Sequence, residues 1–275
     1  KAHFCAVSST SGTATEVTAF SVITDYEKGI KYPLADFEIT PDVAIVDPEL
    51  AETMPKKLVA HTGMDAMTHA IEAYVSTANC DYTDALALHA CEIVFKYLRR
   101  AYKDPQDKEA RAKMAEASVI AGLAFTLPKT TSSHACSFPL TNLYHIPHGE
   151  ACGLTLDCFA RINAEVENGR VHEFARKLGF ADTYALADAI HELKVDLGLR
   201  LDLKDFNLTD EQVAEIKAGK EKLMESAQKL FTKMYEQAGA AAGAGAAGTN
   251  PGQDAGPAPE GFNGDDVVDG DYKEV

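Results

Sequence analysis

The chain has 275 residues, 46% of them hydrophobic, and its 26 basic against 42 acidic side chains give a formal net charge of −16. A chain of this length can bury a real core, and so negative a charge repels nucleic-acid phosphates and anionic lipid. We therefore expect no nucleic-acid partner and no membrane partner, and no apolar run is long enough to span a bilayer. The six cysteines form no CxxC pair and no secretory leader opens the chain, so we expect reduced thiols and a cytoplasmic location.

The first fifty residues are typical of short β-strands between turns. β-Favouring residues alternate with Gly and Pro there, and the expected strands are His3–Ser8, Phe20–Asp25 and Val43–Asp47. From Pro55 onward the pattern changes, because apolar residues recur at helical spacing.

The periodic part predicts a series of helices. Their expected bounds are Pro55–Val75, Tyr82–Tyr102, Asp107–Phe125, Ser132–Leu143, His148–Ile162, Val171–Leu178 and Thr183–Leu197. Asp81 and Asp182 are the expected N-caps of two of them, and Pro105 stands where another helix would begin.

The composition changes again near residue 214. Lys217–Gln237 predicts a charged helix whose narrow apolar stripe would be marginal alone. From Ala238 the chain is rich in Ala and Gly and then acidic, so we expect 238–275 to be disordered. Gly243–Gly248 spells GxGxxG, but that fingerprint binds a dinucleotide only between a strand and a helix, a context that this segment lacks.

Two pairs of polar residues in the helical part have spacings that suit metal ligands. Asp65 and His69 are four residues apart, so on a helix they share one face, although such a pair alone is more simply a solvated Asp and an ordinary surface His. His134 and His148 flank thirteen residues with strong turn chemistry, which allows neighbouring helices to bring them together, and each is equally well a satisfied core or cap histidine. One carboxylate and three imidazoles suit Fe²⁺, Zn²⁺ or a similar ion.

Several motifs in a fixed order resemble the iron-containing (group III) alcohol dehydrogenases over residues 1 to about 213. The motifs are Ser9–Thr18, Val22–Asp25, Gly29–Tyr32, Pro41–Leu50, Gly63–Glu72 and His145–Gly149. The resemblance implies that Asp65, His69, His134 and His148 are the metal ligands, for Fe²⁺ or alternatively Zn²⁺. It also implies that the Ser9–Thr18 loop, chiefly Thr10 and Thr13, and the region of Lys31 face NAD or NADP.

The same resemblance implies the fold class and the domain limits. We expect a mainly α protein, with a remnant of an α/β nucleotide-binding domain at 1–47 and a helical metal-binding catalytic domain at 48–213. The family's diphosphate-binding loop precedes the first residue here, and its helical domain runs past the equivalent of residue 213, so we expect parts of both to be lost. Many relatives have a second His four residues after the first of the late pair, where this chain has Phe138, and the role of His145 is open.

Beyond residue 213 the chain resembles a different family. Ala214–Leu230, Met234–Tyr235 and Asp265–Val275 are similar to the C-terminus of a DnaK-type chaperone. We therefore expect a chaperone-like helix at 214–237, a disordered acidic tail at 238–275, and a join between two unrelated proteins near 213–217.

These expectations lead to one leading function and one alternative. The leading hypothesis is an NAD(P)-linked, metal-dependent alcohol dehydrogenase that interconverts a primary alcohol and an aldehyde, impaired by the missing parts. Its partner is the small alcohol or aldehyde, and a homo-oligomer is allowed. The alternative is a non-catalytic chimeric metal-binding protein with a chaperone-type interaction tail.

Overall fold

The structure is a computed structural model that describes residues 3–25, 27, 30–165, 169–214 and 218. The chain divides into two units, Lys1–Val213 and Ala214–Val275. The predicted helix at 214–237 falls almost entirely outside the described residues, and the predicted tail at 238–275, with its Gly243–Gly248 run, falls wholly outside them.

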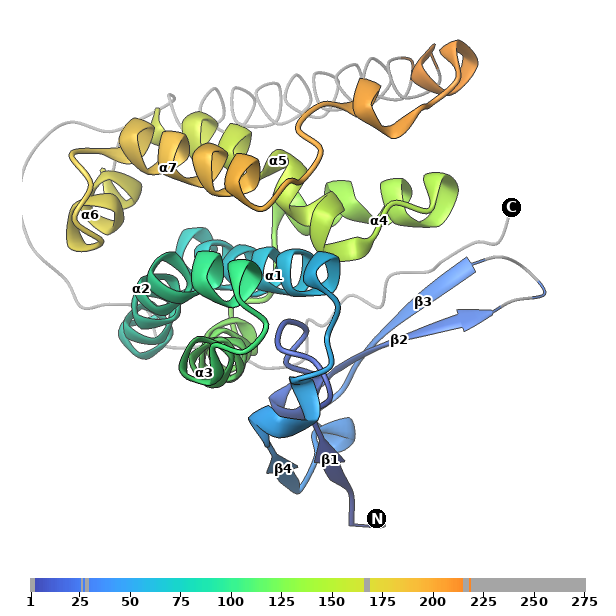
Figure 1. Cartoon of the computed structure of the whole chain (residues 1–275), viewed down its shortest axis with the longest axis vertical. Coiled ribbons are helices and arrows are strands. Elements are labelled where there is room, and N and C mark those ends of the chain that lie inside the picture. Colours follow the sequence, from blue (N-terminus) through green and yellow to red (C-terminus); the bar gives the residue numbers. More distant parts are fainter. Residues whose placement is uncertain (1–2, 26, 28–29, 166–168, 215–217, 219–275) are drawn as a thin grey trace, which may run out of the picture. The chain divides into compact units, whose positions relative to one another are not determined.

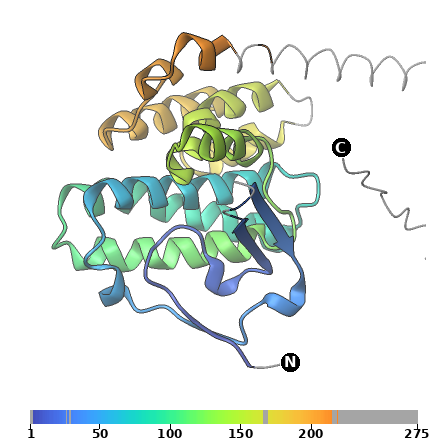
Figure 2. The same cartoon turned by 90° about the vertical axis from the view of Figure 1, so that its right-hand side faces the viewer.

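Helices dominate the first unit, so the expected mainly α architecture is confirmed (Figure 1). The helices are α1 (Lys56–Val75), α2 (Asp81–Lys103), α3 (Lys108–Phe125), α4 (Ser132–Tyr144), α5 (His148–Ala164), α6 (Arg170–Lys177) and α7 (Thr183–Asp196). Helix α1 lies at the centre, with α2 and α3 on one side and α4, α5 and α7 on the other (Figure 2). Within the described ranges, no helix has the length and apolarity needed to cross a membrane.

Helix α1 is buried over most of its length, which explains how it can carry polar groups into the core. Its small residues Ala60, Ala66, Ala70 and Ala73 are fully buried and let the neighbouring helices approach closely. A helix that is covered on all sides is expected to be apolar throughout. The buried Asp, His and Glu side chains of α1 are therefore exceptions that require partners.

The strands form two separate pairs near the N-terminal end of the chain. Strands β1 (Cys5–Val7) and β4 (Val43–Ile45) pair in parallel, and β2 (Phe20–Asp25) pairs with β3 (Ile30–Ala35) in an antiparallel hairpin. The sequence does not predict β3, because it contains Pro33, which lacks the N–H of a regular strand residue. Short 3-10 helices complete the unit at η1 (Thr15–Val17), η2 (Phe37–Ile39), η3 (Pro48–Ala51) and η4 (Leu203–Phe206).

The predicted helices are confirmed to within a few residues, but two of the three residues predicted to mark the start of a helix are wrong. Asp182 caps α7 as expected, since its side chain accepts the backbone N–H of Ala185. Helix α2 is capped by Cys80 rather than Asp81. Helix α3 starts after Asp107, not at Pro105, because the Asp107 carboxylate accepts the N–H of Ala110.

Candidate metal centre

Three helices bring the four predicted metal ligands to one place. Asp65 and His69 come from α1, His134 from α4 and His148 from the first turn of α5. The Oδ1 atom of Asp65 lies 3.4 Å from His134 Nε2, 3.7 Å from His148 Nε2 and 3.9 Å from His69 Nε2. The structure therefore places three imidazole nitrogens around a single carboxylate oxygen.

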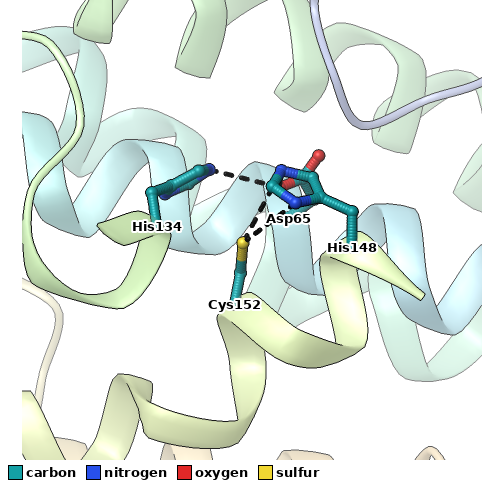
Figure 3. Close-up of side chains that lie close together, drawn as sticks. All are labelled: Asp65, His134, His148 and Cys152. Carbon is teal, nitrogen blue, oxygen red and sulfur yellow. Dashed lines mark hydrogen bonds and ion pairs between the residues drawn. The ribbon is translucent and has the colours of Figure 1, made fainter. Parts of the chain in front are cut away.

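A fifth side chain, Cys152, stands at the same point and was not predicted. Its Sγ atom lies 3.7 Å from His148 Nε2, and Figure 3 shows it directed toward the other donors. Each of Asp65, His134, His148 and Cys152 offers a ligand atom within 4.8 Å of the others. His69 stands outside this tightest group, although its ring stacks on that of His134 with centroids 4.5 Å apart.

The buried polar atoms of this cluster lack the partners that a closed core would give them. Asp65 Oδ1, His134 Nε2 and His69 Nδ1 are buried with no hydrogen-bond partner. Leaving one such atom unsatisfied costs about 1–3 kcal/mol. A cation among the donors would satisfy the carboxylate oxygen and the imidazole lone pairs together, and the oxygen and nitrogen set suits a borderline ion such as Fe²⁺ or Zn²⁺. The residues present therefore fit a metal ion.

The charges in the cluster shift the pKa values of its members. Burial alone would raise the pKa of Asp65, but the adjacent imidazoles of His69, His134 and His148 lower it below its ordinary value. Burial lowers the pKa of His69 to about 4, against the opposing charge of Asp65. His69 is consequently a neutral imidazole at neutral pH, the form in which histidine binds a metal.

Glu72 is a second residue of the site that the sequence analysis did not select. Its Oε1 atom accepts the backbone N–H groups of Ser133 and His134 at 2.6 and 3.3 Å, and its Oε2 atom accepts that of Thr131 at 2.9 Å. Glu72 therefore caps the start of α4, whose own N-cap residue makes no side-chain cap bond.

The same carboxylate orients His134. Glu72 Oε2 lies 2.6 Å from His134 Nδ1. Burial would raise the pKa of Glu72, but its bonds to His134 and to backbone amides lower it, so the ionised carboxylate accepts the Nδ1 proton. With Nδ1 bonded to Glu72, Nε2 is the ring nitrogen of His134 that faces Asp65. A carboxylate behind a ligating His fixes its tautomer in many metal sites.

His148 is oriented in a similar way by Ser137 and placed by Gly149. The Ser137 hydroxyl donates to the His134 carbonyl at 2.8 Å, so it accepts from His148 Nδ1 at 3.3 Å and leaves Nε2 toward Asp65. A Cβ atom at Gly149 would lie 2.0 Å from the His61 carbonyl oxygen. Only glycine therefore lets the first turn of α5 approach α1 closely enough for His148 to face Asp65.

A cavity of about 680 Å³ opens over the cluster and extends to the N-terminal loops. Its wall includes Phe125 and Phe138 from the helices and Phe20 and Val22 from the hairpin. The predicted metal ligands Asp65, His69, His134 and His148 all line this cavity.

The predicted cofactor residues lie at different places relative to this cavity. Thr13 lines it, whereas Thr10 is described but is not among the lining residues. Lys31 lies in β3 opposite Thr24, and its side chain falls outside the described part of the chain. The loop that carries Thr13 packs on α1, since a Cβ atom at Gly12 would lie 2.6 Å from Thr62 Cβ. His145 ends α4 in the left-handed region with φ of 55° and is exposed.

Comparison with known proteins places this site in a family. The model described as Fe-containing alcohol dehydrogenase family, C-terminal, matches residues 59–237, and the model described as iron-containing alcohol dehydrogenase matches residues 1–48. The first match runs past residue 213, where the resemblance was expected to end. The chaperone-like assignment beyond that point has no support from these comparisons.

Individual relatives agree with the family models. A NADPH-dependent butanol dehydrogenase of Clostridium saccharobutylicum is 45% identical over 218 residues, which cover 77% of this chain and 56% of that protein. A 1-propanol dehydrogenase of Salmonella typhimurium is 43% identical over 66% of this chain and 49% of that protein. The structure of sulfoacetaldehyde reductase from Bifidobacterium kashiwanohense in complex with NAD+ is 58% identical with a TM-score of 0.74, and the match covers 77% of this chain and 56% of that chain.

The chain spans about half the length of the curated relatives it matches. The C-terminal family model alone nevertheless covers more than half of the 275 residues. The protein, in which α1, α4 and α5 bring the predicted metal ligands to one cavity, belongs to the iron-containing alcohol dehydrogenase family.

Proposed function

We propose that this chain is a metal-dependent oxidoreductase that interconverts a primary alcohol and an aldehyde with NAD or NADP. The observation that carries the proposal is the cluster of Asp65 and three imidazoles lining a cavity of about 680 Å³. Relatives named for butanol and 1-propanol, at 45% and 43% identity, support the alcohol as substrate class.

In this proposal Asp65, His69, His134 and His148 would hold Fe²⁺ or Zn²⁺. The bound ion would supply a Lewis acid that lowers the pKa of an alcohol oxygen or polarises an aldehyde carbonyl. Glu72 keeps the proton on His134 Nδ1, and Ser137 accepts one from His148 Nδ1, so both imidazoles present Nε2 to the cavity. The protein thereby fixes the donor atoms before any ligand arrives.

The apolar wall of the cavity would keep water away from the reacting atoms. Phe125 stacks on His69 with ring centroids 4.2 Å apart, and the ring of Phe138 lies 6.4 Å from that of His148. A dry environment strengthens electrostatic interactions, because fewer solvent dipoles oppose them. These two phenyl rings would therefore shield the donors from solvent on two sides.

The opposite wall would hold the nicotinamide cofactor, which supplies the hydride acceptor. Thr13, Thr15 and Thr18 contribute to this wall, and their side chains carry hydroxyl groups that can bond to a cofactor. One relative of known structure holds NAD+ and another is named as NADPH-dependent, which supports the nucleotide class. Thr10 and Lys31 stay predictions as cofactor contacts.

Polar side chains among the lining residues suggest that the substrates include anionic aldehydes. Thr141 Oγ1 and Asn142 Oδ1 are buried without a hydrogen-bond partner and belong to lining residues. Lys129 is exposed and lines the same cavity. An aldehyde with a terminal anion would pair with this ammonium group, and the relative named sulfoacetaldehyde reductase supports that substrate class.

The domain limits, the location and the assembly are part of the proposal. A boundary near residue 48 between a nucleotide-binding segment and the helical metal domain is supported by family matches that end at 48 and begin at 59. The chaperone-like helix at 214–237, the cytoplasmic location and a homo-oligomer stay predictions.

Metal analysis and turnover of the same anaerobic preparation would test the function. We expect stoichiometric Fe or Zn, and NAD(P)-dependent turnover of a panel of primary alcohols and aldehydes, both lost in His134→Ala. His89→Ala is the matched control, because His89 is an exposed histidine on α2. Metal binding without turnover would favour the non-catalytic alternative. Absence of both metal and turnover would refute the proposed function.

A further inference from the structure

We infer that Ala14 and Gly122 are positioning residues for the nucleotide cofactor, because their contact seats the loop of residues 9–18 on α3 and turns its hydroxyl groups into the cavity. The inference rests on the proposed function, since it concerns the loop that NAD or NADP would meet. Both residues are buried. Their contact joins the N-terminal segment of the chain to the helical part.

The residues of this loop alternate between buried and cavity-lining positions. Gly12, Ala14 and Glu16 are buried. Thr13 and Thr15, which lie between them in the chain, are exposed and line the cavity, and the Thr15 hydroxyl donates to that of Thr13 at 3.4 Å. The seats of the buried residues therefore determine where the two cavity-lining hydroxyl groups lie.

Two glycines let the loop approach two helices closely. A Cβ atom at Gly12 would lie 2.7 Å from a backbone carbonyl oxygen of α1. A Cβ atom at Gly122, on α3, would lie 2.3 Å from the Ala14 Cβ atom and 2.8 Å from Val17 Cγ2. Because carbon atoms in contact normally lie about 3.5–4.0 Å apart, a larger residue at Gly122 fits only if the loop moves by about 1 Å or more.

Each partner of the contact with α3 is unfavourable for its own backbone. Ala14 has φ of 53°, in the left-handed region, which glycine adopts more readily than alanine. Gly122 lies inside α3, where glycine is less favourable than alanine. The close contact accounts for both residues, because the Ala14 methyl group occupies the space that only a glycine leaves free on the helix.

A displaced loop would affect the cofactor and leave the metal in place. Thr13 and Thr15 would move with the loop, and a misplacement of about 1 Å can cost roughly 100-fold in rate. The predicted metal ligands lie on α1, α4 and α5, whereas Gly122 lies on α3. Loss of cofactor affinity at constant metal content is therefore the signature of this positioning role.

A pair of substitutions in the full chain tests the contact without any need for turnover. In Gly122→Ala, the dissociation constants for NADH and NADPH, measured from nucleotide fluorescence, should rise about tenfold or more while metal per chain stays unchanged. Adding Ala14→Gly removes the opposing methyl group, so the double variant should bind the nucleotide within about threefold of wild type. Ala14→Gly alone should have a smaller effect than Gly122→Ala, because glycine tolerates this backbone.

Leu123→Ala is the matched control, because Leu123 is the exposed neighbour of Gly122 on α3, and it should bind the nucleotide like wild type. Wild-type affinity in Gly122→Ala, or an equal loss in Gly122→Ala and in the double variant, would overturn the inference and leave the proposed function intact. Failure of wild-type protein to bind NADH or NADPH at all would overturn both.

A second measurement uses unmodified protein, so it does not depend on whether a variant folds. Hydrogen exchange read by mass spectrometry should show that the peptide covering residues 9–18 exchanges slowly before any nucleotide is added, because its buried residues hold it on the helices. Exchange of this peptide at the rate of an unfolded chain would overturn the inference, since the loop would then have no fixed seat on α3.

Discussion

The two halves of helix α5 carry buried polar clusters that are satisfied in different ways. In the first half, His148 and Cys152 face Asp65, and Asp65 Oδ1 has no hydrogen-bond partner. In the second half, Asp157 Oδ1 accepts from Lys194 Nζ at 2.7 Å, and Asp157 Oδ2 lies 3.0 Å from His191 Nδ1. Both carboxylates are buried, but the first one faces imidazoles and the second one faces the ammonium group of a lysine.

This contrast separates a structural cluster from a functional one. Lys194 is 1% exposed, and its ammonium group donates to the Leu154 carbonyl at 3.2 Å as well as to Asp157, so the Asp157 cluster is held by protein groups alone. The Asp65 cluster gathers one carboxylate and three imidazoles, and a bound cation would satisfy their oxygen and nitrogen donors together. Unmet hydrogen-bonding capacity, rather than burial or charge alone, identifies the site.

The largest expected effect comes from breaking the open cluster at its centre. In Asp65→Ala, metal content and NAD(P)-dependent turnover should both fall to background, because the variant loses the oxygen that contacts all three imidazoles. Metal analysis after anaerobic purification and gel filtration measures this. Asp188→Ala on α7 is the control, since that carboxylate forms an exposed pair with Arg161. Stoichiometric metal retained in Asp65→Ala would contradict the assignment.

Breaking the closed cluster should instead reduce stability and leave the metal in place. In Lys194→Met, Asp157 keeps His191 and the backbone N–H of Cys158 but loses its buried ammonium partner, and such a loss typically costs about 3–5 kcal/mol. The free energy of unfolding from urea titration should fall by this order, while metal per folded chain should not change. A loss of metal with unchanged stability in Lys194→Met would show that the Asp157 cluster serves metal binding and would contradict its structural role.

The stability difference between wild type and Lys194→Met should also depend on pH, and the direction of that dependence can be predicted. Burial would raise the pKa of Asp157, but Lys194 and His191 lower it below its ordinary value. The contribution of Asp157 to stability is therefore fully present above the unfolded pKa of about 3.9 and is lost as pH falls through the lower folded pKa. The stability difference between wild type and Lys194→Met should thus shrink as pH falls below about 4. A constant difference would show that the ion pair is not its cause.

Local patterns in the sequence account for most of the helices and for part of the site. Helical periodicity predicts Pro55–Val75, and α1 spans Lys56–Val75, because its apolar residues repeat at the period of the helix. The same period places Asp65 and His69 on one face. Strand β3 was not predicted, because it contains Pro33 and proline is rare inside regular strands.

The remaining part of the site depends on contacts between helices, which local patterns do not contain. Glu72 lies seven residues after Asp65 on the same face of α1, so its spacing was a usable signal, but its bond to His134 depends on where α4 begins. Cys152 likewise shares a face with His148. That this face meets α1 depends on the close approach at Gly149.

A smaller effect is expected from the carboxylate behind His134. Glu72→Gln keeps the size of the side chain but removes the charge that holds the proton on His134 Nδ1. Metal affinity should fall about 10–100-fold, the usual range for such supporting groups. Competition with a chelator of known affinity measures the change. Glu92→Gln on α2 is the control, because that glutamate is exposed beside His89. Unchanged metal affinity in Glu72→Gln would show that Glu72 only caps the start of α4.

The smallest expected effect tests the edge of the cavity, where Lys129 is proposed to meet an anionic substrate. Lys129 has φ of 63°, in the left-handed region, so Lys129→Asn removes the charge with a residue that tolerates this backbone. Because Lys129 is exposed, the lost interaction is worth about 1 kcal/mol, which raises KM for an anionic aldehyde by less than about tenfold.

Steady-state kinetics with a sulfonated aldehyde and a neutral aldehyde of equal length would resolve this change. KM for the neutral aldehyde and kcat for both should be unaffected, since the ammonium group interacts with the distant anion and not with the reacting carbon. Lys129→Arg should keep the preference, because it keeps the charge. An equal rise in KM for the two aldehydes in Lys129→Asn would show that Lys129 contributes to the shape of the cavity and does not distinguish substrates by charge.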